Sequence, residues 1–172
     1  MTDQMDVPEL ADEETRLLPA DQTLRALLEG FPDARWSLSA GQDVVHLPSE
    51  RLREFAETAR AGGFELLSDV TAVDWTSRRP RFDVVVSLLS MRHRLRLRLI
   101  VGADAEVQSL VPVWPGANYA EREVYDMFGI VFVDHPDLTR ILMPDDWEGF
   151  PLRKDFAVGS VPVQFKASHR VT

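Results

Sequence analysis

The sequence predicts an α+β fold: a mixed, mostly antiparallel sheet with helices packed on one face, followed by a helix and an extended, proline-rich C-terminal strap. Two observations favour this fold. The apolar spacing gives the order helix, two strands, helix, three strands, which is typical of an α+β layer. The third strand of the later group is the clearest, because Leu95, Leu97 and Leu99 alternate with arginines.

The first helix is predicted to begin after Asp21, a good N-cap residue, and to end at Gly30. Two strands, 36–38 and 44–47, follow around a turn at Gly41. The second helix is predicted to have Ser49 as its N-cap and to end at Gly62-Gly63, and its buried face is Leu52, Phe55, Ala56 and Ala59. The next strands are predicted within 64–75, 82–89 and 95–101.

The last third of the chain has a different character. A helix is predicted from Ala117 to Phe128, with Val124 and Met127 on its apolar face, and it stops at Gly129. Beyond Gly129, prolines interrupt the sequence while many apolar side chains remain. Each of these gains about 1.5–3 kcal/mol if it is fully buried. An irregular segment cannot bury them against itself, so either the domain or another chain must cover them.

We therefore divide the chain into three parts. Residues 1–20 are predicted to be an acidic, disordered tail, residues 21–128 an α+β domain, and residues 129–172 an extended partner-binding strap. In the tail, six acidic residues precede the first basic one: Asp3, Asp6, Glu9, Asp12, Glu13 and Glu14. Such a block is typical of an idle, solvated terminus, and an acidic interaction arm is the alternative.

Composition excludes several classes of protein. The chain has no cysteine, which removes disulfides, thiolate metal sites and cysteine-ligated iron–sulfur clusters. Its formal net charge of −9 argues against a dedicated nucleic-acid binder. No apolar run approaches the ~18 residues that a membrane span requires. The sequence also lacks a phosphate-binding glycine loop and a nucleophile elbow.

The candidates for chemistry are Glu121, Glu123, Asp126 and His135. Three carboxylates and a histidine are able to form a metal-dependent hydrolytic site. Their spacing matches no catalytic metal motif, however, and H-E-x-x-H is absent. A charged outer helix face, with Arg122 neutralising its neighbours, is the simpler interpretation.

Four arginines form a second charged pattern: Arg92, Arg94, Arg96 and Arg98. On a strand, side chains two residues apart point to the same face. The stripe is therefore predicted either to be a solvated or carboxylate-paired sheet face or to receive an acidic partner or phosphates.

A family resemblance rests on the C-terminal motifs. The run AEREVYDMFGIVF at 120–132 is followed by HPDL at 135–138, RILMP at 140–144 and DWEGFPLRKDF at 146–156. WPGANY at 114–119 fits the same pattern. Together these motifs resemble the C subunit of bacterial NADH-quinone oxidoreductase, the 30 kDa subunit family of respiratory complex I. The domain before them agrees in element order but carries no diagnostic motif.

The resemblance implies a non-catalytic scaffold subunit of the peripheral arm, with no catalytic residue, cofactor or metal on this chain. Such a subunit packs against the quinone-site D subunit and lies near the iron–sulfur subunits. FMN, Fe–S clusters and quinone belong to the partner subunits, which pass electrons from NADH to quinone. The implied place is peripheral, on the cytoplasmic face of the cell membrane, with no membrane span and no nucleic-acid partner.

Subunit-interface roles are predicted for polar and aromatic residues that alternate with apolar anchors in this region. They are Glu121, Arg122, Glu123, Asp126, His135, Arg140, Trp147, Arg153, Lys154 and Asp155. Trp and Arg are enriched among interface hot spots. The carboxylates on 121, 123 and 126 are expected to meet basic residues of the domain or of a neighbouring subunit.

Two departures from the family pattern and two alternatives accompany this interpretation. Thr139 stands where a basic residue often follows HPDL, which predicts one changed interface contact, and the tail after Phe156 is short. The first alternative is the equivalent subunit of a related membrane-bound hydrogenase or a ferredoxin-fed complex. The second is the stand-alone metal-dependent hydrolase.

Overall fold

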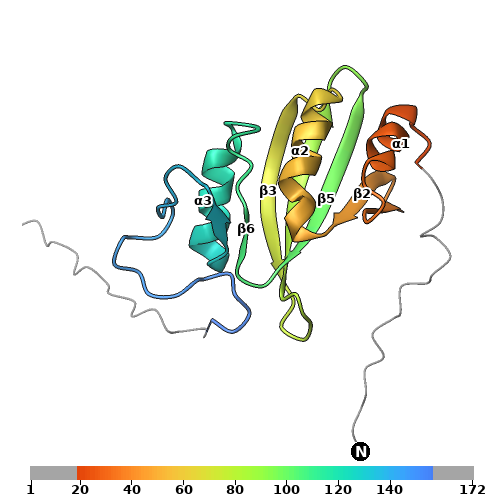
Figure 1. The fold of residues 1–172 in the computed structure, drawn as a ribbon. Helices are drawn as coiled ribbons and strands as arrows, with labels where there is room; N and C mark the ends of the chain where they lie inside the picture. Colours follow the sequence, from red (N-terminus) through yellow and green to blue (C-terminus); the bar gives the residue numbers. More distant parts are fainter. Residues whose placement is uncertain (1–18, 157–172) are drawn as a thin grey trace, which may run out of the picture.

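The computed structural model describes residues 19–156, and Figure 1 shows their arrangement. The predicted acidic tail, except for its last two residues, and the end of the predicted strap lie outside this range. The helices are α1 (Gln22–Glu29), a 3₁₀ turn (Ser49–Arg51) that leads into α2 (Leu52–Ala61), and α3 (Ala117–Phe128). The strands are β1 (Arg35–Ser39), β2 (Gln42–Leu47), β3 (Leu66–Asp74), β4 (Phe82–Ser90), β5 (Leu95–Ala103), β6 (Glu106–Gln108) and β7 (Val131–Val133).

The main sheet has five strands in the order β1-β2-β5-β4-β3. Its pairings are antiparallel, except that β2 and β5 run parallel, with Val45 opposite Leu99. The mixed, mostly antiparallel sheet of the predicted α+β fold is therefore confirmed. A second, two-stranded parallel sheet pairs β6 with β7 and places Val107 opposite Phe132.

One face of the main sheet forms the core. Along β4 the residues alternate between buried and half-buried, which is the pattern of a sheet covered on one side. The buried residues of α1, α2 and α3 belong to the same apolar cluster as the buried residues of β4 and β5. In Figure 1, α2 lies across the sheet, while α3 and β6 stand beside the β3 edge.

The helix ends follow the sequence signals with one exception. The carboxylate of Asp21 accepts hydrogen bonds from the amides of Thr23 (2.7 Å) and Leu24 (3.1 Å), so the predicted cap of α1 is correct. The prediction that Ser49 caps α2 is wrong. The chain enters α2 through the 3₁₀ turn, and no side chain at Pro48 or Arg51 makes a capping hydrogen bond.

The arginine stripe is only partly a strand feature. Arg92 lies in the turn before β5, and Arg94 has a positive φ of 55°, so neither shares the strand geometry of Arg96 and Arg98. The turn between β4 and β5 occupies residues 91–94, so it includes the first two arginines of the stripe. Arg98 donates to the side-chain oxygen of Gln42 at 2.8 Å, which joins β5 to the neighbouring β2.

The segment that leads into α3 is anchored by Trp114. Its ring is buried, and its indole N–H donates to the carbonyl of Phe64 at 3.2 Å. Beyond α3, Ile130 and Phe132 are also buried in the core. The domain therefore covers the first apolar side chains of the predicted strap. Within residues 19–156, no helix combines the length and the apolar character needed to cross a bilayer.

Candidate protein interface

The candidate interface is formed by residues 129–156, the described part of the predicted strap, together with α3. We call residues 129–156 the C-terminal segment. Apart from β7 it has no regular secondary structure, so its path depends on specific contacts with the domain. Two buried carboxylates, Asp126 and Asp74, bind this segment directly.

Asp126 is fully buried near the end of α3. One carboxylate oxygen accepts from the guanidinium of Arg140 at 2.7 Å. The other accepts from three successive amides, those of Ile141 (3.0 Å), Leu142 (2.7 Å) and Met143 (2.9 Å). Burial alone would raise the pKa of Asp126, but these hydrogen bonds outweigh it and hold the pKa below its usual value. A single carboxylate thus fixes the backbone at 141–143 on the helix.

Two arginines extend this clamp. Arg140 also donates to the carbonyl of Gly149 at 3.1 Å, and its guanidinium lies over the ring of Phe150, 5.3 Å from the centroid. Arg122 donates to the carbonyl and the hydroxyl of Thr139, at 3.0 and 2.7 Å. The residue that departs from the family pattern is therefore bound to α3 of its own chain.

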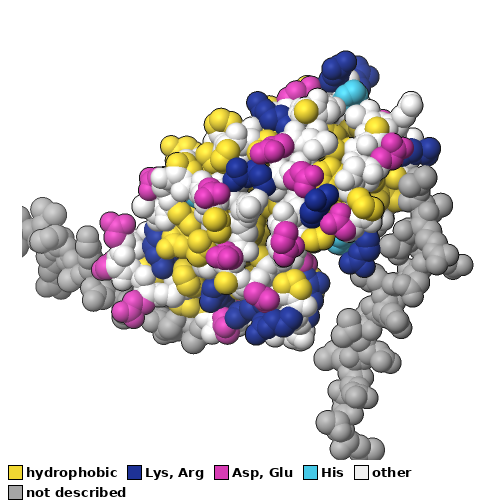
Figure 2. Space-filling model, in the orientation of Figure 1, with side chains coloured by type: hydrophobic (Ala, Val, Ile, Leu, Met, Phe, Trp, Pro, Cys, Tyr) yellow, Lys and Arg dark blue, Asp and Glu magenta, His cyan; other side chains and the backbone are white. Residues whose placement is uncertain are grey.

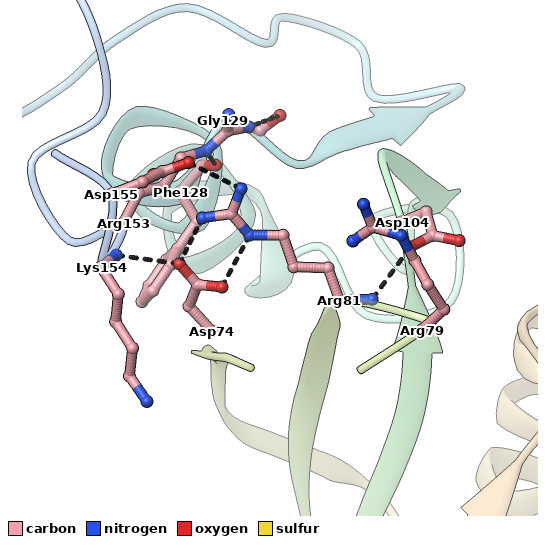
Figure 3. A network of polar contacts seen from close by, with 9 residues as sticks. All are labelled: Asp74, Arg79, Arg81, Asp104, Phe128, Gly129, Arg153, Lys154 and Asp155. Atoms are coloured by element: carbon pink, nitrogen blue, oxygen red, sulfur yellow. Dashed lines mark hydrogen bonds and ion pairs between the residues drawn. The ribbon is translucent and has the colours of Figure 1, made fainter. Parts of the chain in front are cut away.

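A second clamp joins the segment to the loop between β3 and β4, as Figure 3 shows. Arg81 donates to both oxygens of Asp74 at 2.7 Å, and it reaches Asp155 at 2.8 Å. The amide of Lys154 also donates to Asp74, at 2.9 Å. The hydrogen bonds from Arg81 are the main reason that the pKa values of Asp74 and Asp155 lie below their usual range.

Arg153 closes the end of α3. Its guanidinium lies over the ring of Phe150 (4.5 Å to the centroid) and near that of Phe82 (5.4 Å), and it donates to the carbonyl of Phe128. The amide of Leu152 donates to the carbonyl of Met127 at 3.0 Å. The last carbonyls of a helix lack partners within the helix. Here Leu152 and Arg153 of the C-terminal segment donate the missing hydrogen bonds. Burial lowers the pKa of Arg153.

Gly129 makes this return possible. Its φ of 72° lies in the left-handed region, which ends α3 as predicted. A Cβ at this position would come within 2.6 Å of two carbons of the Phe150 ring and within 2.7 Å of the Arg153 guanidinium. The glycine therefore allows the left-handed backbone that ends α3, and its missing side chain leaves room for Phe150 and Arg153.

Glu121 is the third buried carboxylate, and its position differs from the predicted one. Its oxygens accept from the hydroxyl of Ser109 at 2.6 Å and from the amide of Leu110 at 2.5 Å, rather than from a basic residue. Burial raises its pKa to about 7, although these hydrogen bonds and the nearby Arg53 oppose the rise. Glu121 therefore joins α3 to the strand end after β6, inside the chain.

The remaining predicted interface residues lie closer to solvent. His135 is half-buried and contacts the carbonyl of Asn118 at 3.2 Å, and Glu123 is exposed. Trp147 stacks on Phe156, with ring centroids 6.4 Å apart, and its buried indole N–H has no partner among the described residues. The ammonium of Lys154 lies over the ring of Trp75, the residue after β3, 5.5 Å from its centroid.

The residues proposed for a metal site do not converge. Glu121 and Asp126 bind different parts of their own chain through protein donors, as described above. In residues 19–156, no group of three or more His, Asp or Glu side chains is placed to hold a metal ion.

Sequence reasoning missed Asp74 and Arg81. A usable signal was present, because Val70, Ala72 and Asp74 occupy alternate positions of one strand and all three are buried. An acidic residue at a core position of a strand requires a partner. Nothing in the spacing identifies Arg81 or the segment 80 residues later as that partner.

Comparison with known proteins identifies the family. The family model described as "Respiratory-chain NADH dehydrogenase, 30 Kd subunit" matches residues 45–161. The chain belongs to this family. The NADH-quinone oxidoreductase C subunit of Roseiflexus castenholzii is 46% identical over 150 residues, which cover 83% of this chain and 86% of that protein. The protein of the same name from Acidothermus cellulolyticus is 43% identical over 155 residues, covering 85% and 81%.

Two solved structures have a similar fold. One, described as Nqo5 of a trypsin-resistant fragment (1-134), is 34% identical and has a TM-score of 0.62, covering 67% of this chain and 99% of that chain. A chain of the membrane-bound sulfane sulfur reductase, an archaeal respiratory membrane complex, is 22% identical with a TM-score of 0.70, covering 85% and 94%. The second likeness shows the fold alone. As a 30 kDa family member, the chain is a subunit of an oxidoreductase complex, NADH-quinone oxidoreductase.

Proposed function

We propose that this chain is a non-catalytic scaffold subunit of the peripheral arm, on the cytoplasmic face of the membrane. It packs against the quinone-site D subunit and near the iron–sulfur subunits. In this role it supports electron transfer from NADH, through FMN and Fe–S clusters on partner subunits, to quinone. The observation that carries the proposal is the C-terminal segment, which is clamped by buried charges yet keeps Leu142 and Leu152 53% and 55% exposed.

The clamps support this role because they hold an irregular segment in one conformation before any partner binds. A preordered surface loses less conformational entropy on binding. Large apolar side chains remain exposed on this part of the chain: Tyr119, Val131, Val133, Leu142 and Leu152. Figure 2 shows hydrophobic side chains mixed with acidic ones over the region of α3 and the segment. An apolar patch with a polar rim is typical of a protein interface.

The ten predicted interface residues then divide into two groups. Asp126, Arg140, Arg153 and Asp155, with Glu121 and Arg122, act inside the chain by fixing the surface. Glu123, His135, Trp147 and Lys154 are the candidates for direct contact with partner subunits.

The related complexes and the hydrolase are less favoured. The named relatives, at 41–46% identity, are NADH-quinone oxidoreductase subunits, and the likeness to the sulfane sulfur reductase is one of fold. The hydrolase requires Glu121, Glu123, Asp126 and His135 to share one metal ion. The carboxylates of Glu121 and Asp126 are instead bound by separate protein donors.

The experiment compares equally exposed leucines. Leu142→Ser and Leu152→Ser are introduced into cells that assemble the whole complex, with Leu38→Ser as the control, because Leu38 is 55% exposed on β1. We expect the first two variants to lower the amount of chain that copurifies with the complex, while Leu38→Ser does not. Urea unfolding of each purified chain checks that stability is unchanged. Normal assembly and quinone reductase activity in both segment variants would contradict the proposal.

Trp147→Ala and Arg153→Ala, introduced into the same cells, test two of the interface residues predicted from the sequence. Both are expected to reduce the assembled complex while the domain stays folded. Loss of assembly is expected to follow directly from the missing ring in Trp147→Ala and indirectly, through a loosened segment, in Arg153→Ala.

A further inference from the structure

The turn between β4 and β5 carries a compact group of positive charges. Arg92, Arg94 and Arg96 are exposed, and the exposed side chain of Met91 stands beside them. Figure 2 shows Lys or Arg side chains and a histidine gathered at the top of the molecule, where Figure 1 places the β4–β5 hairpin. We call residues 91–96 the basic tip.

The basic tip has little neutralising charge in the described part of the chain. No described carboxylate lies within 4.0 Å of the guanidinium groups of Arg92, Arg94 or Arg96, although six other arginines of residues 19–156 form such ion pairs. The carboxylate of Glu65 accepts a hydrogen bond from the backbone amide of Met91 at 3.1 Å. The tip is thus a local positive site on a protein whose formal net charge is −9.

The described chain begins beside this tip. The hydroxyl of Thr23, at the start of α1, lies 3.5 Å from Nδ1 of His93. The same histidine ring lies against Gly63 at the end of α2, where a Cβ would come within 2.8 Å of Nε2. The first turn of α1 therefore contacts the centre of the tip, and Thr23 is only five positions after residue 18 in the sequence.

Residues 1–18 carry the complementary charge. They contain six acidic residues and one basic residue, Arg16, and Asp12, Glu13 and Glu14 are consecutive. From the geometry we infer that this acidic arm, residues 1–18, binds the basic tip of its own chain. The arm is the occupant because it has the opposite charge and is joined covalently, five positions upstream, to the residue that contacts the tip.

The tether is long enough for this contact. Thr23 lies nine positions after Glu14, and an extended chain spans up to about 3.3–3.6 Å per residue. Because the arm and the tip belong to one chain and a short connection joins them, the effective concentration of the arm at the tip is roughly in the millimolar range. Each exposed ion pair is weak by itself, so the contact depends on several pairs and on the tether. It must therefore be sensitive to salt.

The test uses the full-length chain, which has no cysteine of its own. Val7→Cys receives a nitroxide spin label, and the broadening of backbone amide NMR signals locates the arm. At about 10 mM salt, where the Debye length is about 30 Å, we expect at least about a twofold loss of intensity for residues 91–96. At about 1 M salt, where it is about 3 Å, the intensity returns.

Two sets of substitutions assign the effect to charge. Asp12→Asn/Glu13→Gln/Glu14→Gln in the arm, and Arg92→Glu/Arg96→Glu in the tip, are each expected to abolish the broadening. The control Arg35→Glu/Arg79→Glu changes the charge equally at the other end of the sheet and is expected to preserve it. The amide spectrum of each unlabelled variant verifies that the fold is intact.

Three results overturn the inference. One is a low-salt spectrum without broadening at the tip, and another is broadening that the neutralised arm retains. The third comes from mixing spin-labelled chain with separately ¹⁵N-labelled chain. Broadening of the ¹⁵N-labelled chain in this mixture identifies the arm of a second copy as the occupant.

Discussion

The fully buried carboxylate of Asp126 forms an ion pair with Arg140 at 2.7 Å, and it also accepts hydrogen bonds from the amides of the three residues that follow Arg140. The pair therefore does more than neutralise a charge. It binds an irregular stretch of backbone to α3 and so sets the direction in which the C-terminal segment leaves the helix.

Asp126→Asn tests this clamp. The side-chain NH₂ group of the asparagine would face groups that are themselves hydrogen-bond donors, and Arg140 would lose its counter-charge. Breaking one partner of a buried pair typically costs about 3–5 kcal/mol. We expect a loss of this order in the free energy of unfolding, measured by urea titration. Glu123→Gln, on the exposed side of the same helix, is the control and should change it little. Equal midpoints for both variants would refute the clamp.

Glu121→Gln is predicted to change how stability depends on pH. Between the usual glutamate pKa and about 7, the folded chain holds a proton on Glu121 that the unfolded chain has released. The free energy of unfolding therefore falls as the pH rises through this window and levels off above it. A shift of this size corresponds to roughly 3 kcal/mol.

The measurement is the difference in unfolding free energy between Glu121→Gln and the unchanged chain at pH 5, 6, 7 and 8. We expect the difference to move in favour of the variant as the pH rises. The same difference for Glu123→Gln should stay constant. A pH-independent difference for Glu121→Gln would show that the carboxylate is ionised throughout.

Asp74→Asn and Asp155→Asn separate the two acidic partners of Arg81. Asp74 is buried and Asp155 is 57% exposed, so the first substitution should destabilise the chain far more than the second. Because the pKa of Asp74 is lowered, its contribution is complete above the usual aspartate pKa and is lost as the pH falls below it. The deficit of Asp74→Asn, measured by urea unfolding, should therefore shrink as the pH falls below about 4. A comparable deficit in both variants would contradict this division.

Gly129→Ala is predicted to destabilise the chain, and Gly116→Ala provides a matched control at the other end of α3. Gly116 has a φ of −65°, and nothing lies within 4 Å of a Cβ built there. At Gly129 the backbone is left-handed and Phe150 occupies the space. We expect Gly129→Ala to lose more than about 1 kcal/mol and Gly116→Ala to be neutral or slightly stabilised. Thermal or urea unfolding of the two variants is the measurement. Similar stability in both would show that a Cβ at position 129 does not clash with Phe150.

Much of the fold could be predicted from the sequence because its longer elements have strong periodicity. The helical face of Leu52, Phe55 and Ala59, and the alternation in β4 and β5, report burial directly. β6 was missed because three residues are too few for a period. The start of α2 was misplaced because a 3₁₀ turn satisfies the backbone groups that Ser49 was expected to cap.

The candidate site was less predictable because its contacts join distant residues. The motif residues around α3 were found, but their partners were not. Asp74 meets the amide of Lys154 across 80 positions, and Glu121 meets Ser109 rather than a basic side chain. Local charge patterns indicate that such carboxylates need partners, whereas only the packing of the segment against β3 and α3 identifies them.

The parallel pairing of β2 with β5 also has a consequence for synthesis of the chain. The β1–β2 hairpin is complete by residue 47, but the strand that it must join, β5, begins at Leu95. Ribosomes add about 5–20 residues per second, so the nascent hairpin waits for several seconds with Val45 and Leu47 uncovered. An isolated two-stranded hairpin is marginally stable in water. We therefore expect chaperone engagement during translation to concentrate on this interval.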